Sequence, residues 1–158
     1  MTHPACAEIL SALSDERVSV LSFVELLQQE QSLLTENSID QLQSLAEKKS
    51  AQAVRLNELN EVCRRLLGKV IPTPDNTAIA AWFETNSKEG LALWQEVRAL
   101  AEQALQLNRI NGELILMKQR LNQQLLTALT RAVNQANLYG SDGQTNFSPG
   151  SGRSLGSV

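Results

Sequence analysis

Residues 88–138 form one long segment in which apolar side chains recur at alternating spacings of three and four. The stripe they make comprises Leu93, Val97, Leu100, Ala104, Leu107, Asn111, Leu114, Lys118, Leu121, Leu125, Ala128 and Ala132. Such alternation is typical of the seam of a coiled coil. We therefore predict one long helix over residues 88–138, and the fold must supply partners for this seam.

A second apolar stripe runs beside the seam and widens the face that must be covered. Its members are Ala101, Leu105, Asn108, Ile115, Leu126, Leu129 and Val133. Two adjacent stripes make a face too wide for one partner helix, so we expect two neighbouring helices. Asn108 and Asn111 interrupt the stripes next to Gly112. A buried Asn can fix the alignment of packed helices, whereas a Gly inside a helix weakens it locally and permits a hinge.

Three further helices are predicted, over residues 4–34, 39–67 and 74–85. Ser38, with Gln41 three residues later, matches a capping box at the start of the second helix. We expect this second helix to stop at Gly68, since glycine is favoured just after the last residue of a helix. Pro72 and Pro74 exclude a continuous helix through the connection that follows.

Two more hydroxyl side chains are predicted caps. Thr73 precedes the short third helix, and Ser87 precedes the long last one. In the first helix, Glu16 and Gln31 interrupt the apolar stripe, and Lys49 and Gln52 break the seam of the second. Trp82 and Phe83, in the short helix, are expected to pack over one end of the first two helices.

The short turn between the first two helices predicts an antiparallel pair. Aromatic residues make up only 4% of the chain, while helix-forming residues are abundant. We predict an all-α fold: an elongated antiparallel helical hairpin, a short connecting helix and one long C-terminal helix in a coiled-coil-like bundle. Residues 1–138 would form this single domain, and residues 139–158 a flexible tail rich in Gly and Ser.

The last helix is predicted to be much longer than either helix of the hairpin. Either it bends back, or its C-terminal half lies beyond the hairpin without intrachain cover. In the second case Leu121, Leu125, Leu126, Leu129 and Val133 would be exposed. An exposed apolar stripe of that size predicts an interaction site, which would bind another copy of the chain or an amphipathic helix from elsewhere.

No constellation of side chains suits catalysis or metal binding. The chain has one histidine, His3, and two cysteines, Cys6 and Cys63, at no redox or metal spacing. The formal net charge is −3, and the basic residues are spread along the predicted helices with only small clusters at Lys48–Lys49 and Arg64–Arg65, which disfavours nucleic acid as a partner. We expect a protein that is not an enzyme, with no metal or cofactor and no membrane insertion. The N-terminus lacks the features of a secretory signal, so a cytoplasmic location is expected.

Three stretches resemble the FlgN-type flagellar export chaperones: NRINGELI at 108–115, SIDQLQSLAEKK at 38–49 and, most specifically, LYGSDGQT at 138–145. The order of helices resembles that family along nearly the whole chain. The resemblance implies a small cytoplasmic chaperone of the flagellar type III export system. Such chaperones bind the C-terminal helical regions of the hook-associated proteins at the hook–filament junction, prevent their premature assembly and deliver them to the export gate.

The resemblance also implies two sets of site residues. Binding of the substrate protein maps onto the outer half of the last helix, where the candidates are Leu114, Ile115, Leu121, Leu125, Leu126, Leu129 and Val133. Contact with the export gate maps onto Tyr139, Gly140, Asp142, Gly143 and Gln144. Beyond Thr145 the tail departs from the family pattern. The alternative is a self-assembling structural coiled-coil protein that forms a homo-oligomer through the same stripe and has no role in secretion.

Overall fold

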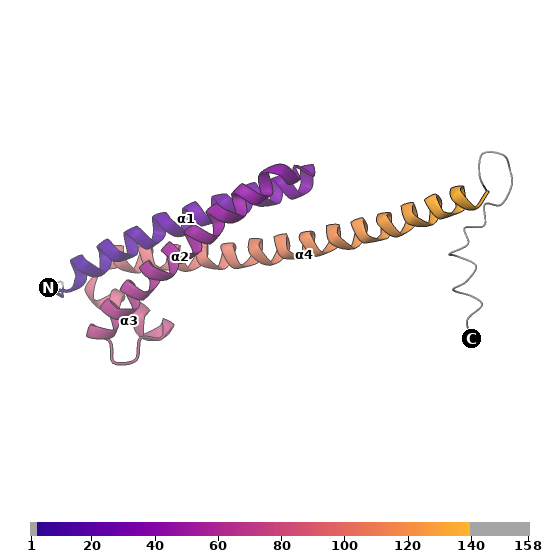
Figure 1. The fold of residues 1–158 in the computed structure, drawn as a ribbon. Coiled ribbons are helices and arrows are strands. Elements are labelled where there is room, and N and C mark those ends of the chain that lie inside the picture. The colour runs from indigo at the N-terminus through magenta and orange to yellow at the C-terminus, as the bar shows by residue number, and fades with distance from the viewer. Residues whose placement is uncertain (1–2, 140–158) are drawn as a thin grey trace, which may run out of the picture. The chain divides into compact units, whose positions relative to one another are not determined.

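The computed structural model describes residues 3–139, and the regular structure in that part of the chain is entirely helical (Figure 1). The helices are α1 (Cys6–Glu36), α2 (Ile39–Val70), α3 (Asn76–Asn86) and α4 (Lys88–Tyr139). The predicted all-α fold class is confirmed. The chain divides into two units, residues 1–114 and 115–158, at a point inside α4.

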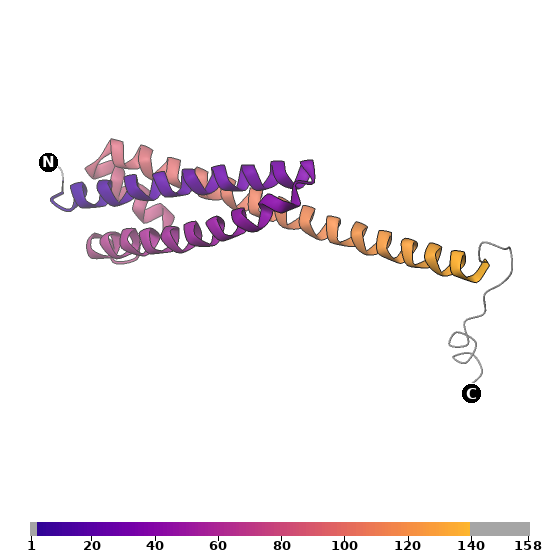
Figure 2. The same ribbon diagram turned by 45° about the horizontal axis from the view of Figure 1, so that its top comes forward.

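In the first unit, α1 and α2 form an antiparallel hairpin, and both views show them side by side (Figures 1 and 2). The turn depends on Asn37, whose φ of 60° and ψ of 29° are left-handed and whose backbone N–H donates to Leu33 O. Asn tolerates this conformation better than most residues. Ser38 precedes α2 but makes no side-chain cap, so the predicted capping box with Gln41 does not form.

The end of α2 and the start of α3 correct two predictions. The helix α2 continues past Gly68 to Val70. Ile71 is extended, with φ −125° and ψ 119°, because the following proline disfavours helical backbone at the residue before it. The cap of α3 is Asp75 and not Thr73: Asp75 Oδ1 accepts a hydrogen bond from Ala78 N at 2.8 Å.

The connection between α3 and α4 is short and tightly packed. Ser87 Oγ accepts a hydrogen bond from Gly90 N at 2.9 Å, so the predicted cap of α4 is present. A Cβ atom added to Gly90 would lie 2.5 Å from Phe83 Cδ1 and 2.6 Å from Phe83 Cε1. Glycine therefore allows the start of α4 to approach a ring that is fully buried.

Two apolar clusters hold the first unit together. The larger one joins all four helices where α3 covers the end of the hairpin, and it comprises Ile9, Ala12, Leu13, Cys63, Leu67, Ile71, Ile79, Phe83, Trp94 and Val97. Phe83 belongs to this cluster and Trp82 packs against it, as predicted. The smaller cluster is made of Val20, Val24, Leu27 and Ala104. These clusters position residues 88–111 of α4 against the hairpin.

In the first unit, the hairpin covers the seam of α4 but leaves the second stripe open. Leu105 is 71% exposed, and Ala101 and Asn108 are exposed as well. The expectation that the two hairpin helices together cover both stripes is therefore wrong for these residues. Because α4 contacts the hairpin through Val97, Ala104 and Asn111, the stripe beside the seam faces outward.

Candidate functional site

The seam of α4 changes from buried to exposed between Asn111 and Leu121. Val97 and Ala104 are each 6% exposed and Asn111 is fully buried. Leu114 is half-buried, and Leu121 is 56% exposed. The same heptad pattern thus provides core contacts in the first unit and an exposed apolar face in the second.

The seven residues predicted to bind a substrate protein lie on one face of α4. Five are exposed: Leu121 (56%), Leu125 (58%), Leu126 (59%), Leu129 (53%) and Val133 (57%). Leu114 and Ile115 are half-buried. Their spacings of three and four keep them together on the helix surface. We call this set the apolar face.

Two exposed apolar residues in the same part of α4 were missing from the prediction. Met117 is 52% exposed and stands four residues before Leu121, at the edge of the apolar face. A flexible Met side chain suits a surface that must fit an irregular partner. The four-residue spacing to Leu121 and Leu125 is the sequence signal that identifies it. Leu116, 54% exposed, projects from another side of the helix.

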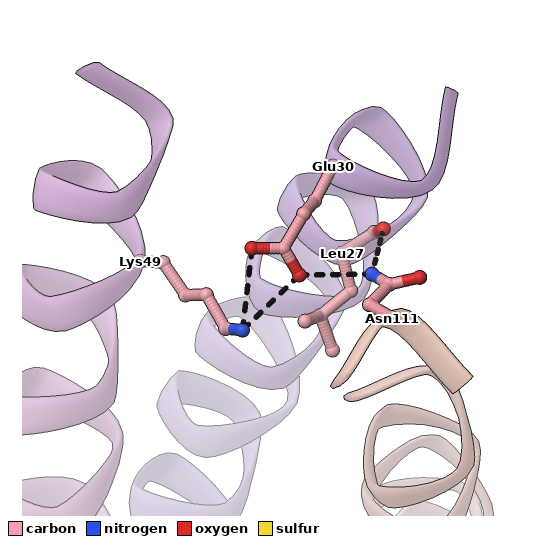
Figure 3. A network of polar contacts seen from close by, with 4 residues as sticks. All are labelled: Leu27, Glu30, Lys49 and Asn111. Atoms are coloured by element: carbon pink, nitrogen blue, oxygen red, sulfur yellow. Dashed lines mark hydrogen bonds and ion pairs between the residues drawn. The ribbon is translucent and has the colours of Figure 1, made fainter. Parts of the chain in front are cut away.

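A buried polar cluster connects α1, α2 and α4 where the covered seam ends (Figure 3). Asn111 Nδ2 donates to Leu27 O at 2.8 Å and to Glu30 Oε1 at 2.9 Å. Lys49 Nζ lies 3.1 Å from the same carboxylate oxygen and 3.4 Å from Glu30 Oε2. We call Glu30, Lys49 and Asn111 the polar clasp.

The polar clasp has the form of an alignment device. Glu30 is 6% exposed and Asn111 is fully buried, so both must find partners inside the protein. The Asn111 amide nitrogen and the Glu30 carboxylate meet each other when α1 and α4 are aligned at this register, whereas Asn111 Oδ1 has no hydrogen-bond partner. These bonds fit the register interpretation of Asn111. Gly112 is exposed, and a Cβ atom there would meet nothing within 4 Å.

Glu30, rather than the predicted Gln31, interrupts the apolar stripe of α1 at this level, since Gln31 is only half-buried. The other predicted interruption, Glu16, is 6% exposed and accepts a hydrogen bond from Asn60 Nδ2 at 3.0 Å. Burial, and next the hydrogen bond and charge of Glu16, raise the pKa of the Cys63 thiol. Cys63 is therefore an unreactive part of the core.

Of the residues predicted to contact the export gate, only Tyr139 lies in the part of the chain that the structure describes. Tyr139 is the last residue of α4. Gly140, Asp142, Gly143 and Gln144 lie outside the described residues. Among residues 3–139, no group of three or more His, Cys, Asp and Glu side chains is placed to hold a metal ion. The same residues include no helix with the length and hydropathy required to cross a membrane.

The fold and the apolar face together define a class of protein: a small all-α protein that carries an uncovered apolar helix surface, as proteins that bind amphipathic helices do. A comparison with known protein families finds a match. The family model described as FlgN protein matches residues 1–146. The chain therefore belongs to the FlgN family of flagellar export chaperones. This is a chaperone family and not an enzyme family. No curated protein and no solved structure matches the chain.

Proposed function

We propose that this protein is a cytoplasmic chaperone of the flagellar type III export system that binds the C-terminal helical regions of hook-associated proteins along residues 114–138. The family supports a role in flagellar export in general. The observation that supports the binding site is the apolar face, whose five outer members are each more than half exposed.

The proposed mechanism is helix-in-groove recognition. An amphipathic helix of the substrate protein covers the apolar face and buries its own apolar side chains at the same time. Burial yields roughly 25 cal/mol per Å² of apolar surface removed from water, which drives association without any chemical step. While the substrate helix is covered in this way, it is not available to pair with its assembly partners, so premature assembly is prevented.

The test is a binding titration with the C-terminal region of each hook-associated protein. Leu125→Asp and Leu129→Asp place a charge in the middle of the apolar face. We expect each to weaken binding by roughly 30-fold, since loss of a central apolar anchor costs about 2 kcal/mol. Asn134→Asp is the matched control, because it adds the same charge to an exposed position on the opposite side of α4. Equal affinities for all three variants would refute the site.

Delivery of the substrate protein to the export gate would depend on the segment that follows the apolar face and begins at Tyr139. We propose that Tyr139, Gly140, Asp142, Gly143 and Gln144 contact the export gate, as the family resemblance implies. Tyr139→Ala should leave the substrate titration unchanged and lower secretion of the substrate, while Tyr139→Phe retains the ring and serves as the control. Loss of substrate binding in Tyr139→Ala would overturn this division between binding and delivery.

The alternative function, self-assembly as a structural coiled coil, uses the same apolar face. Light scattering over a concentration series distinguishes the two. A chaperone should remain of constant mass and bind the substrate helices. A stable oligomer that ignores those helices would support the structural alternative.

A further inference from the structure

Five exposed side chains form a second stripe along residues 115–138, separate from the apolar face. Its members are Leu116, Arg120, Thr127, Arg131 and Leu138. Leu116, Thr127 and Leu138 follow one another at intervals of eleven residues, and Arg120 and Arg131 are eleven residues apart as well. Eleven residues make about three turns of an α-helix, so each series stays on one side of α4. We call these five residues the arginine stripe.

The arginine stripe lies on the side of α4 that is opposite the apolar face. At about 100° of rotation per residue, its members fall within a sector of roughly 60°, and the centre of that sector is about 180° from the centre of the apolar face. Arg120, Thr127 and Arg131 line one shallow groove, and Leu116 and Leu138, at the two ends of the stripe, are 54% and 38% exposed. A helix that covers the apolar face would therefore leave the arginine stripe open.

The positive charge of the arginine stripe has no acidic partner in its surroundings. Residues 115–138 contain Lys118, Arg120 and Arg131 and no acidic residue. Lys118 is a seam residue on the side of the apolar face, so the two arginines carry the charge of the opposite side. Among the residues that the structure describes, no carboxylate forms an ion pair with either guanidinium. The nearest preceding acidic residue, Glu113, is seven residues from Arg120, about 10 Å along the helix.

We infer that the arginine stripe is a docking surface for an acidic helical segment of a second partner protein. The matching segment carries carboxylates about three turns apart, opposite Arg120 and Arg131, and an apolar side chain near each end. Arginine binds carboxylates through two parallel hydrogen bonds, and it is frequent among the residues that dominate the binding energy of interfaces. Thr127, between the two arginines, donates its hydroxyl to Gln123 O at 2.9 Å, so it presents no unsatisfied donor to the partner.

This inference goes beyond the proposed function, which uses the apolar face and the segment that begins at Tyr139. The arginine stripe and the apolar face have no residue in common. One helix would therefore hold a substrate helix on one side and an acidic partner on the other, and neither would displace the other.

The distribution of charge disfavours other occupants of the arginine stripe. Two copies of the chain that paired through it would bring four arginines together without a carboxylate. An anionic membrane is an extended surface, and it would repel residues 1–114, which contain 16 acidic and 10 basic side chains, a formal charge of −6. Nucleic acid is bound through many phosphate contacts, for which two arginines are few. A helical segment of a protein meets residues 115–138 alone, and carboxylates complement their charge.

The experiment uses the full-length chain and two synthetic helical peptides that differ only at two positions eleven residues apart. One peptide carries Glu at both positions and the other carries Lys. Fluorescence anisotropy at low salt should show about tenfold tighter binding of the Glu peptide, since two exposed ion pairs replace two repulsions. Added salt should reduce this difference, because the charged groups are exposed to solvent.

Charge reversal of the arginine stripe is the decisive comparison. The double variant Arg120→Glu/Arg131→Glu should prefer the Lys peptide. The control Arg65→Glu/Lys88→Glu makes the same change in net charge at exposed positions of the first unit, and it should keep the preference for the Glu peptide. If the control changes the preference as much as the arginine variant does, the arginine stripe has no special role and the inference is overturned.

A second comparison separates the two sides of α4. The neutral double variant Leu125→Gln/Leu129→Gln damages the apolar face and should bind the Glu peptide as tightly as the native chain does. Saturation of the native chain with the C-terminal region of a hook-associated protein should likewise leave this affinity unchanged. If either change abolishes binding of the Glu peptide, the peptide occupies the apolar face and the inference is overturned.

The remaining outcomes distinguish this inference from the proposed function. If the chain binds hook-associated proteins but does not distinguish the two peptides, the inference fails and the proposed function stands. If Arg120→Glu/Arg131→Glu reverses the preference but no hook-associated protein binds, the proposed function fails and the inference stands. If the arginine variant loses binding to phosphatidylglycerol vesicles, or loses self-association, with no effect on the peptides, the stripe serves a membrane or a second copy and the inference is overturned.

Discussion

Asn111 and Glu30 join α4 to α1 inside the first unit, and a double-mutant cycle on this pair tests whether their bond fixes the alignment of the helices. Asn111 Nδ2 lies 2.9 Å from Glu30 Oε1, and it also donates to Leu27 O at 2.8 Å. Both side chains are buried. The variants are Asn111→Ala, Glu30→Ala and the combination of the two.

The expected magnitudes follow from the number and type of bonds. Asn111→Ala loses one bond to a carbonyl, worth about 1 kcal/mol, and one to a carboxylate, worth about 1.5–3 kcal/mol. It also removes a buried Oδ1 that has no hydrogen-bond donor, which recovers part of that loss. We expect a net destabilisation of about 1–3 kcal/mol for each single variant. The coupling energy should be about 1–2 kcal/mol.

Urea denaturation followed by circular dichroism at the helical band measures the four unfolding free energies. The control cycle uses Arg17 and Glu96, whose side chains are 42% and 50% exposed and whose nearest charged atoms lie 3.3 Å apart. An exposed pair of this kind should couple by less than about 1 kcal/mol. If the Asn111–Glu30 coupling is no larger than that of the control, the polar clasp does not align the helices.

Three residues supply further predictions about stability. Gly90→Ala should destabilise the fold by about 1–3 kcal/mol, because its methyl group would overlap the Phe83 ring. Gly112→Ala should stabilise the fold by up to about 1 kcal/mol, because the new methyl group meets no atom within 4 Å and alanine favours the helix. Thermal unfolding of the Gly90→Ala and Gly112→Ala variants measures the contrast, and equal shifts in unfolding temperature would contradict it. The raised pKa of Cys63 means that the folded state retains the thiol proton when the unfolded chain has lost it. The contribution of the Cys63 thiol to the free energy of unfolding is therefore complete below about pH 8.5, and above that pH it declines by at most about 1.4 kcal/mol per pH unit. Denaturation series between pH 7 and 10 on the native chain and on Cys63→Ala measure this decline as the difference between the two proteins.

The helical architecture could be predicted because it depends on local signals. The heptad spacing of the seam indicated one helix from Lys88, and the hydroxyl of Ser87 indicated its cap. The end of α2 and the start of α3 could not be placed correctly, because two nearby residues each gave a signal for the same helix boundary. Gly68 lies in open space and does not end the helix, whereas the proline after Ile71 does. Asp75, which is closer to the first turn of α3, caps it in place of Thr73.

The apolar face could be predicted as a set of residues, but the polar clasp could not. Gln31 and Glu30 both fit the stripe of α1, since they follow Leu27 by four and three residues. Only the positions of Asn111 and Lys49 on two other helices decide which of them turns inward. Such tertiary partners leave no local pattern. Asn111 itself was recognisable because a polar residue at a seam position is unusual.

The central claim is that residues 114–138 present an apolar face that is open in the free chaperone and covered by a substrate helix. Hydrogen–deuterium exchange of these residues, with and without the C-terminal region of a hook-associated protein, tests it most directly. In the free protein they should exchange much faster than the core of α1, because a single uncovered helix opens easily, and binding should slow them strongly. Protection equal to that of α1 in the free protein, or no change at saturating substrate, would contradict the claim.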